Sequence, residues 1–262
     1  MKLIVCVKQV PDTNEVRIDP VKGTLVRDGV PSILNPDDKH ALEAALRLKD
    51  ADASVHITAL SMGPPQAEEA LRECLAMGAD EAILMSDRAF AGADTWATSN
   101  TLAAAIRKIG DYDLVFAGRQ AIDGDTAQVG PQLAERLGIP QVTYVQDIEL
   151  RGRTLTVERQ LEDGHEVIAV ELPCLLTAIK ELNEPRYMSI DGIYDAFREK
   201  TVTVWALKDL GMAPDQVGLE ASPTQVQRSF TPEPKGQGIR LSGTSEEMAE
   251  ALVASLAHQH VI

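Results

Sequence analysis

The sequence predicts an α/β protein built on a doubly wound, mostly parallel, Rossmann-like sheet. Two observations carry this prediction. Short apolar runs alternate with segments of helical length across the first half of the chain, and such strands pair in parallel through right-handed crossovers. The chain has 262 residues, of which 44% are hydrophobic, so it can form one large domain with a smaller appendage.

The first half of the chain divides into strands and helices in order. Leu3–Val7 is a short apolar run typical of a buried parallel strand, and residues 16–19 and 23–29 could pair as a small hairpin. Asn35 is expected to cap the next helix, 35–50, with Pro36 at its first position. The alternation continues with strands at 54–60, 81–86 and 112–117, and with helices at 64–78, 94–109 and 126–137.

After Pro140 the alternation of strands and helices gives way to successive strand-like runs. Four strand-like runs at 143–150, 154–164, 165–172 and 174–179 predict an antiparallel extension of the same sheet. Residues 208–242 are rich in Pro, Gly and Gln and predict an extended arm, and Thr244 and Glu247 fit a capping box that opens an amphipathic helix. We therefore expect an α/β domain at 1–206, and at 207–262 an arm with a C-terminal helix that folds back on its own domain or contacts a partner subunit.

Composition excludes several classes of protein. A net charge of -15 argues against a nucleic-acid binder, which needs clustered Lys and Arg. The three cysteines, Cys6, Cys74 and Cys174, are far apart and indicate neither a disulfide framework nor a metal site. No apolar run approaches the ~20 residues of a membrane span, and the N-terminus does not resemble a signal peptide, so we expect a cytoplasmic protein.

The candidate ligand site lies at the carboxyl ends of the strands, where open α/β sheets bind ligands. There Asp125 is expected to cap a helix that starts at Thr126, which leaves first-turn amides free to bind a phosphate. Gly124 would let the backbone approach closely, Gln128 would add an amide, and Asp123 would bond a ribose hydroxyl or the backbone. The alternative is a plain helix cap without a ligand. No catalytic residues emerge, so any reactive group would belong to a cofactor.

Three motifs resemble one family, the beta subunit of electron transfer flavoprotein. They are "GRQAIDGDTAQVGPQLAE" at 118–135, "VERQLEDGHEVIAVELPCLLT" at 157–177 and "NEPRYMSI" at 183–190, and the resemblance extends over the whole chain. It implies a heterodimer with an FAD-carrying alpha subunit and a crevice in this chain for AMP or a second FAD. The cofactor contacts that it implies are Cys6, Val7, Lys8, Gln9, Val10, Asn35, Asp38, Ser61, Met62, Gly63, Gln66, Thr95, Gln120, Asp123, Gly124, Asp125, Thr126, Ala127, Gln128 and Val129.

The stretch from Val7 to Leu46 resembles the flavin-bifurcating and nitrogen-fixation-associated forms of that family. This implies an FAD that accepts hydride from NADH and sends electrons to the alpha-subunit FAD and to ferredoxin or flavodoxin. Lys8, Arg17 and Arg119 are then the cations expected to be available to a pyrophosphate or a reduced flavin. Whether the chain is itself an enzyme stays open, because it would act as an electron carrier within an NADH-dependent heterodimer.

The resemblance also implies docking to an acyl-CoA dehydrogenase-type or quinone-reductase partner. The residues expected to dock are the exposed apolar side chains Tyr187, Met188, Ile190 and Ile193; the alternative is a helix packed on its own domain. Two other functions remain open. One is a housekeeping beta subunit with structural AMP, and the other is a regulatory nucleotide-binding module without a redox role.

Overall fold

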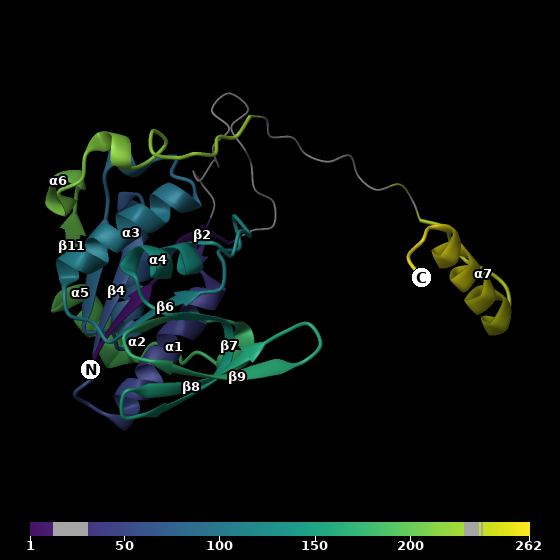
Figure 1. Cartoon of the computed structure of the whole chain (residues 1–262), viewed down its shortest axis with the longest axis horizontal. Helices are drawn as coiled ribbons and strands as arrows, with labels where there is room; N and C mark the ends of the chain where they lie inside the picture. The colour runs from purple at the N-terminus through teal and green to yellow at the C-terminus, as the bar shows by residue number, and fades with distance from the viewer. Residues whose placement is uncertain (13–30, 228–235, 237) are drawn as a thin grey trace. The chain divides into compact units, whose positions relative to one another are not determined.

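The computed structural model describes residues 1–12, 31–227, 236 and 238–262 (Figure 1). They form two compact units, 1–227 and 228–262. The first unit extends past residue 206, where the sequence placed the boundary. Residues 207–227 contain α6 (Leu207–Leu210), a 3₁₀ turn η4 (Pro214–Gln216) and the buried side chains of Val217 and Ser222, so they are not a free arm. None of the described helices is long and apolar enough to cross a membrane.

A single large sheet organises the first unit and confirms the predicted fold class. Among the described residues it has nine strands in the order β11-β5-β4-β1-β6-β10-β7-β8-β9. Neighbouring strands from β11 to β7 are parallel. Their bounds are β11 Val202–Trp205, β5 Glu81–Met85, β4 His56–Met62, β1 Lys2–Cys6, β6 Leu114–Gly118, β10 Cys174–Ala178 and β7 Gln141–Arg151.

The antiparallel extension exists, but it is shorter than the sequence indicated. β7, β8 (Thr154–Gln160) and β9 (His165–Glu171) pair antiparallel. β10 does not join them, because it lies between β6 and β7 and runs parallel to both, so the antiparallel prediction was wrong for 174–179. All five of its residues are buried, as is typical of an inner parallel strand.

Helices cover both faces of the sheet (Figure 1). α1 (Pro36–Ala51) and α2 (Glu68–Met77) contribute to one apolar core, and α3 (Thr95–Ile109) and α4 (Val129–Leu137) to the other. The chain leaves β1 toward α1 and leaves the adjacent β6 toward α4, so it departs toward opposite faces. The carboxyl ends of β1 and β6 are therefore the topological switch point at which such sheets bind ligands.

A small antiparallel pair, β2 (Gln9–Pro11) and β3 (Ser32–Leu34), follows β1 and was not foreseen. α5 (Ile190–Arg198), which precedes the edge strand β11, is the helix that the sequence analysis gave as the alternative for this segment. The hairpin expected at 16–29 lies outside the described residues. Short 3₁₀ turns complete the unit: η1 Pro65–Ala67, η2 Arg88–Phe90 and η3 Lys180–Leu182. In the second unit, α7 (Ser245–His258) has the predicted capping box between Thr244 and Glu247.

Candidate nucleotide site

Asp38 joins the two strands that diverge at the switch point. Its Oδ2 accepts a hydrogen bond from the backbone N–H of Lys8, just after β1, at 2.8 Å, and its Oδ1 accepts one from Gly118 N–H, the last residue of β6, at 3.0 Å. Burial raises the pKa of the Asp38 carboxyl to about 7, against the bonds from Asn35, Lys8 and Gly118 that favour its ionised form. Asp38 thus binds the protein's own backbone where the sequence placed a ligand contact.

Asn35 makes a second connection between the same two segments. Its backbone N–H donates to Lys8 O at 2.9 Å, its Nδ2 donates to Gln120 O at 2.9 Å, and its Oδ1 accepts from Ile122 N–H at 3.1 Å. Asn35 does occupy the N-cap position of α1, as predicted, but its side chain makes no cap bond to the helix. Asn35 is fully buried, and its side chain holds the backbone of the loop after β6 through Gln120 and Ile122.

Gly118 is required for this close approach. A Cβ atom there would lie 2.3 Å from Asp38 Oδ1 and 2.7 Å from the backbone nitrogen of Asp38. Any side chain would therefore push the start of α1 away from β6. The sequence signalled neither Gly118 nor the pairing, because both depend on the register of distant segments.

The two predicted cations in the described part of the site are already paired. Lys8 Nζ lies 2.6 Å from Asp123 Oδ1, and Arg119 Nε lies 3.2 Å from Asp37 Oδ2. The Arg119 guanidinium also lies over the ring of Tyr144, 5.9 Å from its centroid, and Tyr144 is held at φ +57° in a β-bulge. Lys8 and Arg119 therefore each have a carboxylate partner that a phosphate would have to displace, and their role toward a pyrophosphate or flavin stays a prediction; Arg17 lies outside the described residues.

The loop after β6 has a different geometry from the one predicted. α4 begins at Val129. Gln128 is its N-cap residue, and no side chain makes a cap hydrogen bond. Asp125 instead accepts a hydrogen bond on Oδ1 from Gln120 Nε2 at 2.7 Å, so its predicted role as the cap was wrong. Asp125 and Ala127 have φ of +47° and +51°, a left-handed backbone that non-glycine residues rarely adopt and that marks strained functional loops.

The strained loop leaves a row of amides without partners. The backbone N–H groups from Thr126 to Gly130 donate no hydrogen bond to any other residue that the structure describes. They stand at the start of α4, where the helix dipole places partial positive charge. The loop can therefore bind an anion such as a phosphate through its backbone, although its side chains are acidic or neutral.

A second helix start adjoins this loop. Thr95 Oγ1, at the start of α3, donates to Gln128 Oε1 at 2.8 Å and accepts from Gln132 Nε2 at 3.3 Å. Asp94 caps α3 by accepting from Ala97 N–H at 2.9 Å. Thr95 is thus brought to the predicted loop, and its hydroxyl is engaged there.

The other predicted contacts lie along the same edge of the sheet. Ser61, at the end of β4, is fully buried, and its Oγ has no partner among the described residues, whereas Gln66 in η1 is exposed. A Cβ on Gly63 would come within 2.9 Å of Ala67 Cβ, so this turn requires glycine. The remaining predicted residues of this edge are the buried Cys6, Val7 and Val10 and the half-buried Gln9 and Met62.

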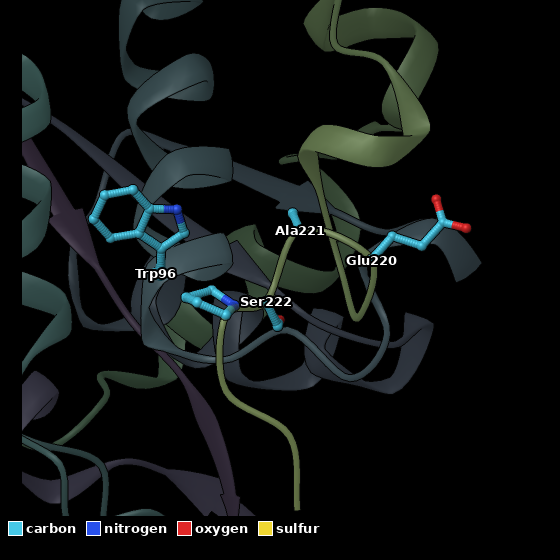
Figure 2. Close-up of a pocket in the computed structure, with 5 residues that line it drawn as sticks. Trp96, Glu220, Ala221 and Ser222 are labelled. Atoms are coloured by element: carbon cyan, nitrogen blue, oxygen red, sulfur yellow. The ribbon is translucent and has the colours of Figure 1, made fainter.

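A shallow pocket of about 450 Å³ lies beside the start of α3 (Figure 2). It is lined by Trp96 and residues 220–223, and the guanidinium of Arg136 stacks 4.1 Å from the centroid of the indole ring. Figure 2 shows the Glu220 side chain extending away from Trp96. The pocket therefore offers an apolar wall without converging polar groups.

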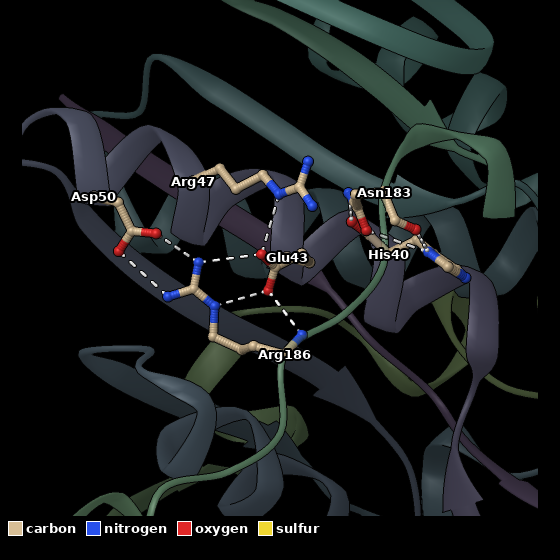
Figure 3. A network of polar contacts seen from close by, with 6 residues as sticks. All are labelled: His40, Glu43, Arg47, Asp50, Asn183 and Arg186. Atoms are coloured by element: carbon tan, nitrogen blue, oxygen red, sulfur yellow. Dashed lines mark hydrogen bonds and ion pairs between the residues drawn. The ribbon is translucent and has the colours of Figure 1, made fainter.

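A polar network fixes the chain just before the predicted docking residues (Figure 3). The guanidinium of Arg186 binds both oxygens of Glu43 on α1 and lies 2.6 Å from Asp50 Oδ2, and Asn183 Nδ2 donates to His40 O at 2.9 Å. Glu43 is buried, and burial alone would raise its pKa, but hydrogen bonds from Arg186 and Arg47 hold it below its usual value. Sequence reasoning missed this network, although an acidic residue within the apolar face of α1 was a signal for it.

The predicted docking side chains are exposed, and α5 also packs on its own unit. Tyr187 is 99% exposed and Ile190 is 86% exposed, with Met188 and Ile193 less so. Gly192 lies so close to α2 that a Cβ would come within 2.2 Å of Ala76 O. The helix therefore rests on α2 through one face and presents apolar side chains on another.

Comparison with known proteins adds the family. The model of the electron transfer flavoprotein domain matches residues 22–210. The chain is 62% identical to the caffeyl-CoA reductase-Etf complex subunit CarD of Acetobacterium woodii and 60% identical to the electron transfer flavoprotein subunit beta of Clostridium acetobutylicum, with all of each chain covered. It is 46% identical to the protein FixA of Azorhizobium caulinodans, over 98% of this chain and 94% of the relative.

The domain match covers most of the chain, and these relatives align with nearly its full length. The sheet places its switch point at the loop that the sequence motifs singled out. The chain therefore belongs to the electron transfer flavoprotein family, as a beta subunit of the type grouped with CarD and FixA.

Proposed function

We propose that this chain is the beta subunit of an electron-bifurcating electron transfer flavoprotein, and that its crevice binds FAD. The observation that carries the proposal is the row of amides from Thr126 to Gly130 at the switch point, which have no partner in the part of the chain that the structure describes. The chain that presents them is 62% identical to CarD, whose name places it in a caffeyl-CoA reductase-Etf complex. It is also 51% identical to the acryloyl-CoA reductase electron transfer subunit gamma of Anaerotignum propionicum.

In this proposal the protein binds the phosphates through its backbone. The amides after Asp125 and the dipole of α4 attract the first phosphate, while Thr126 supplies a hydroxyl. The bound FAD would supply the redox chemistry, taking hydride from NADH and passing electrons to the alpha-subunit FAD and to ferredoxin or flavodoxin. The chain's own residues hold the loop in place through Asn35, Asp38 and Lys8.

Two exposed surfaces suit the partners of such a subunit. The apolar side chains from Tyr187 to Ile193 would dock an acyl-CoA dehydrogenase-type or quinone-reductase partner. Within its own unit, α7 buries none of its described side chains, and Leu252 and Val253 are about half exposed there. We assign α7 to contact with the alpha subunit, because a helix with exposed apolar residues needs a surface to cover them.

One observation favours a second function, a housekeeping beta subunit with AMP. Both described cations near the crevice are paired with carboxylates, so a second phosphate must compete with Asp123 for Lys8 or with Asp37 for Arg119. AMP carries a single phosphate, which the amides alone would satisfy.

Flavin and adenine nucleotide released per heterodimer separate these functions. The chain would be produced together with its alpha subunit, its nucleotides quantified after denaturation, and the complex titrated with NADH. Two FAD per heterodimer, bleached by NADH, are expected. One FAD with one AMP and no reduction by NADH would establish the housekeeping form instead, and a chain that binds nucleotide without flavin or alpha subunit would be a regulatory module.

A further inference from the structure

Asp38 is the one charged side chain in the described structure that binds the backbone at the ends of both β1 and β6. Its two oxygens hold the N–H of Lys8 and the N–H of Gly118, and Asp38 itself is only 7% exposed. The loop that follows Gly118 carries the amides that have no partner among the described residues, and Lys8 follows β1 at the other side of the switch point. The Asp38 carboxylate therefore links the backbone at the ends of the two strands directly.

We propose that Asp38 is a positioning residue, which acts through the backbone of Lys8 and Gly118 to hold the phosphate-binding loop at the spacing that nucleotide binding needs. This inference rests on the proposed nucleotide-binding function. It assigns Asp38 no contact with the nucleotide, because both of its oxygens already accept hydrogen bonds from the protein.

The surroundings of Asp38 support a role in placement. Asn35 ties Lys8 O to Gln120 O and to Ile122 N–H, so the second connection spans the same gap from the same turn. The Asp38 carboxylate lies so close to Gly118 that any side chain at position 118 would collide with it. Removal of a buried carboxylate that accepts from two backbone amides of separate segments leaves both donors without their protein acceptor and removes the link between the segments.

Three variants test the proposal by equilibrium binding of AMP and of adenosine to the full-length chain. Asp38→Ala removes both acceptors. Asp38→Asn keeps the shape and one acceptor, but turns an N–H group toward one of the two backbone donors. The control, Asp111→Asn, removes the same charge from a side chain that is 95% exposed beside Lys2, at the opposite edge of the sheet.

We expect AMP affinity to fall by about tenfold in Asp38→Asn and by more in Asp38→Ala, while Asp111→Asn keeps the wild-type affinity. Adenosine affinity should change by less than about twofold, because adenosine lacks the phosphate that the displaced loop holds. A loss of folded protein alone would lower the apparent binding of both ligands equally. Equal AMP affinity in Asp38→Asn and Asp111→Asn, or parallel losses for AMP and adenosine, would overturn the proposal.

A measurement on the wild-type chain covers the case in which Asp38 variants do not fold. If the bonds from Asp38 favour nucleotide binding, bound nucleotide must favour those bonds by the same factor. Saturation with AMP should therefore slow hydrogen exchange at the amides of Lys8 and Gly118, and unchanged exchange at both would contradict the role. A wild-type chain that binds neither AMP nor FAD would overturn the proposed function as well, whereas binding with unchanged exchange would overturn the role of Asp38 alone.

Discussion

Arg186 binds Glu43 across 143 residues of sequence, with both its backbone N–H and its guanidinium directed at one carboxylate. Nε lies 2.8 Å from Oε2, and the backbone N–H reaches the same oxygen at 3.1 Å. The next residue, Tyr187, is almost fully exposed. The segment thus passes within one residue from a half-buried Arg186, paired with the buried Glu43, to a side chain that faces solvent, and the ion pair fixes where the exposed part begins.

Arg186→Lys should lower the free energy of unfolding by about 2 kcal/mol, because lysine cannot occupy both carboxylate oxygens and Glu43 remains buried. Urea unfolding monitored by circular dichroism measures the change. Arg151→Lys is the matched control, since Arg151 is 78% exposed and pairs with Glu149 on the surface. Its effect should stay below about 1 kcal/mol. Equal effects of the two substitutions would contradict the role of the buried pair.

The difference in the free energy of unfolding between wild type and Arg186→Lys should also depend on pH. Hydrogen bonds from Arg186 lower the pKa of Asp50 and, against the effect of burial, that of Glu43. A carboxyl with a lowered folded-state pKa stabilises the fold above its unfolded pKa, which is about 4 for both groups, and this contribution is lost as pH falls through the folded value. Unfolding at a series of pH values should show the gap between the two proteins narrowing below about pH 4. A gap that widened on acidification would contradict this assignment.

The contribution of Asp38 to the free energy of unfolding should depend on pH with the opposite sign. Its folded-state pKa is raised by burial to about 7, so between its unfolded value of about 4 and that value the folded chain binds more protons than the unfolded chain. The stability of the nucleotide-free wild type, measured relative to Asp38→Asn, should therefore be greatest at low pH and decline as pH rises toward 7. Urea unfolding of both proteins over that range tests it, and a relative stability that rose with pH would refute the raised pKa.

The strained loop gives a pair of glycine substitutions with opposite expected signs. Ala127 has φ +51°, so Ala127→Gly should raise the free energy of unfolding by about 0.5 kcal/mol by relieving strain. Ala121 is not among the residues with positive φ, and Ala121→Gly should lower it by about 0.5 to 1 kcal/mol. Thermal unfolding of the nucleotide-free chain compares them, and destabilisation by both would mean that the loop is not strained at Ala127.

Ile190→Ala should weaken electron transfer to an acyl-CoA dehydrogenase-type partner while NADH still reduces the flavin. Ile190 is 86% exposed, so the substitution should change the free energy of unfolding by less than about 0.5 kcal/mol. A raised KM for the partner at constant stability is the expected result. Val226→Ala, at a 71% exposed site far along the chain, serves as the control. Loss of NADH reduction together with partner transfer would indicate a damaged fold.

Local signals predicted α1–α4, α7 and most strands of the large sheet, but not α6 or the short strands β2, β3 and β11. Pro36 and the acids that follow it predicted a helix at 35–50, and α1 spans Pro36–Ala51. The strand order was not predictable, because the burial of β10 on both faces does not say which strands flank it. Asp125 fitted a helix cap by residue type, but Gln120 engages its carboxylate and the helix starts four residues later. That competition arises from loop packing, which a local pattern does not report.

The sequence predicted where the candidate residues gather better than it predicted which hydrogen bonds they make. The strand ends chosen from the alternation do gather at one edge of the sheet, where Thr95 meets Gln128 and Lys8 meets Asp123. The roles of Asn35 and Asp38 depend on the register between β1 and β6, which brings Gly118 against the start of α1. Whether the predicted residues touch a nucleotide stays a prediction for the binding experiments.

The three cysteines are all buried, and burial raises the pKa of Cys174 and, with a further contribution from Asp38, that of Cys6, each to about 12; the pKa of Cys74 is raised as well. At neutral pH they remain buried and protonated. The thiolate is the form that reacts with peroxides and alkylating agents. The folded chain would thus resist damage at sulfur. Its folded form should tolerate iodoacetamide and mild peroxide, and the thiols should become reactive only as the chain unfolds.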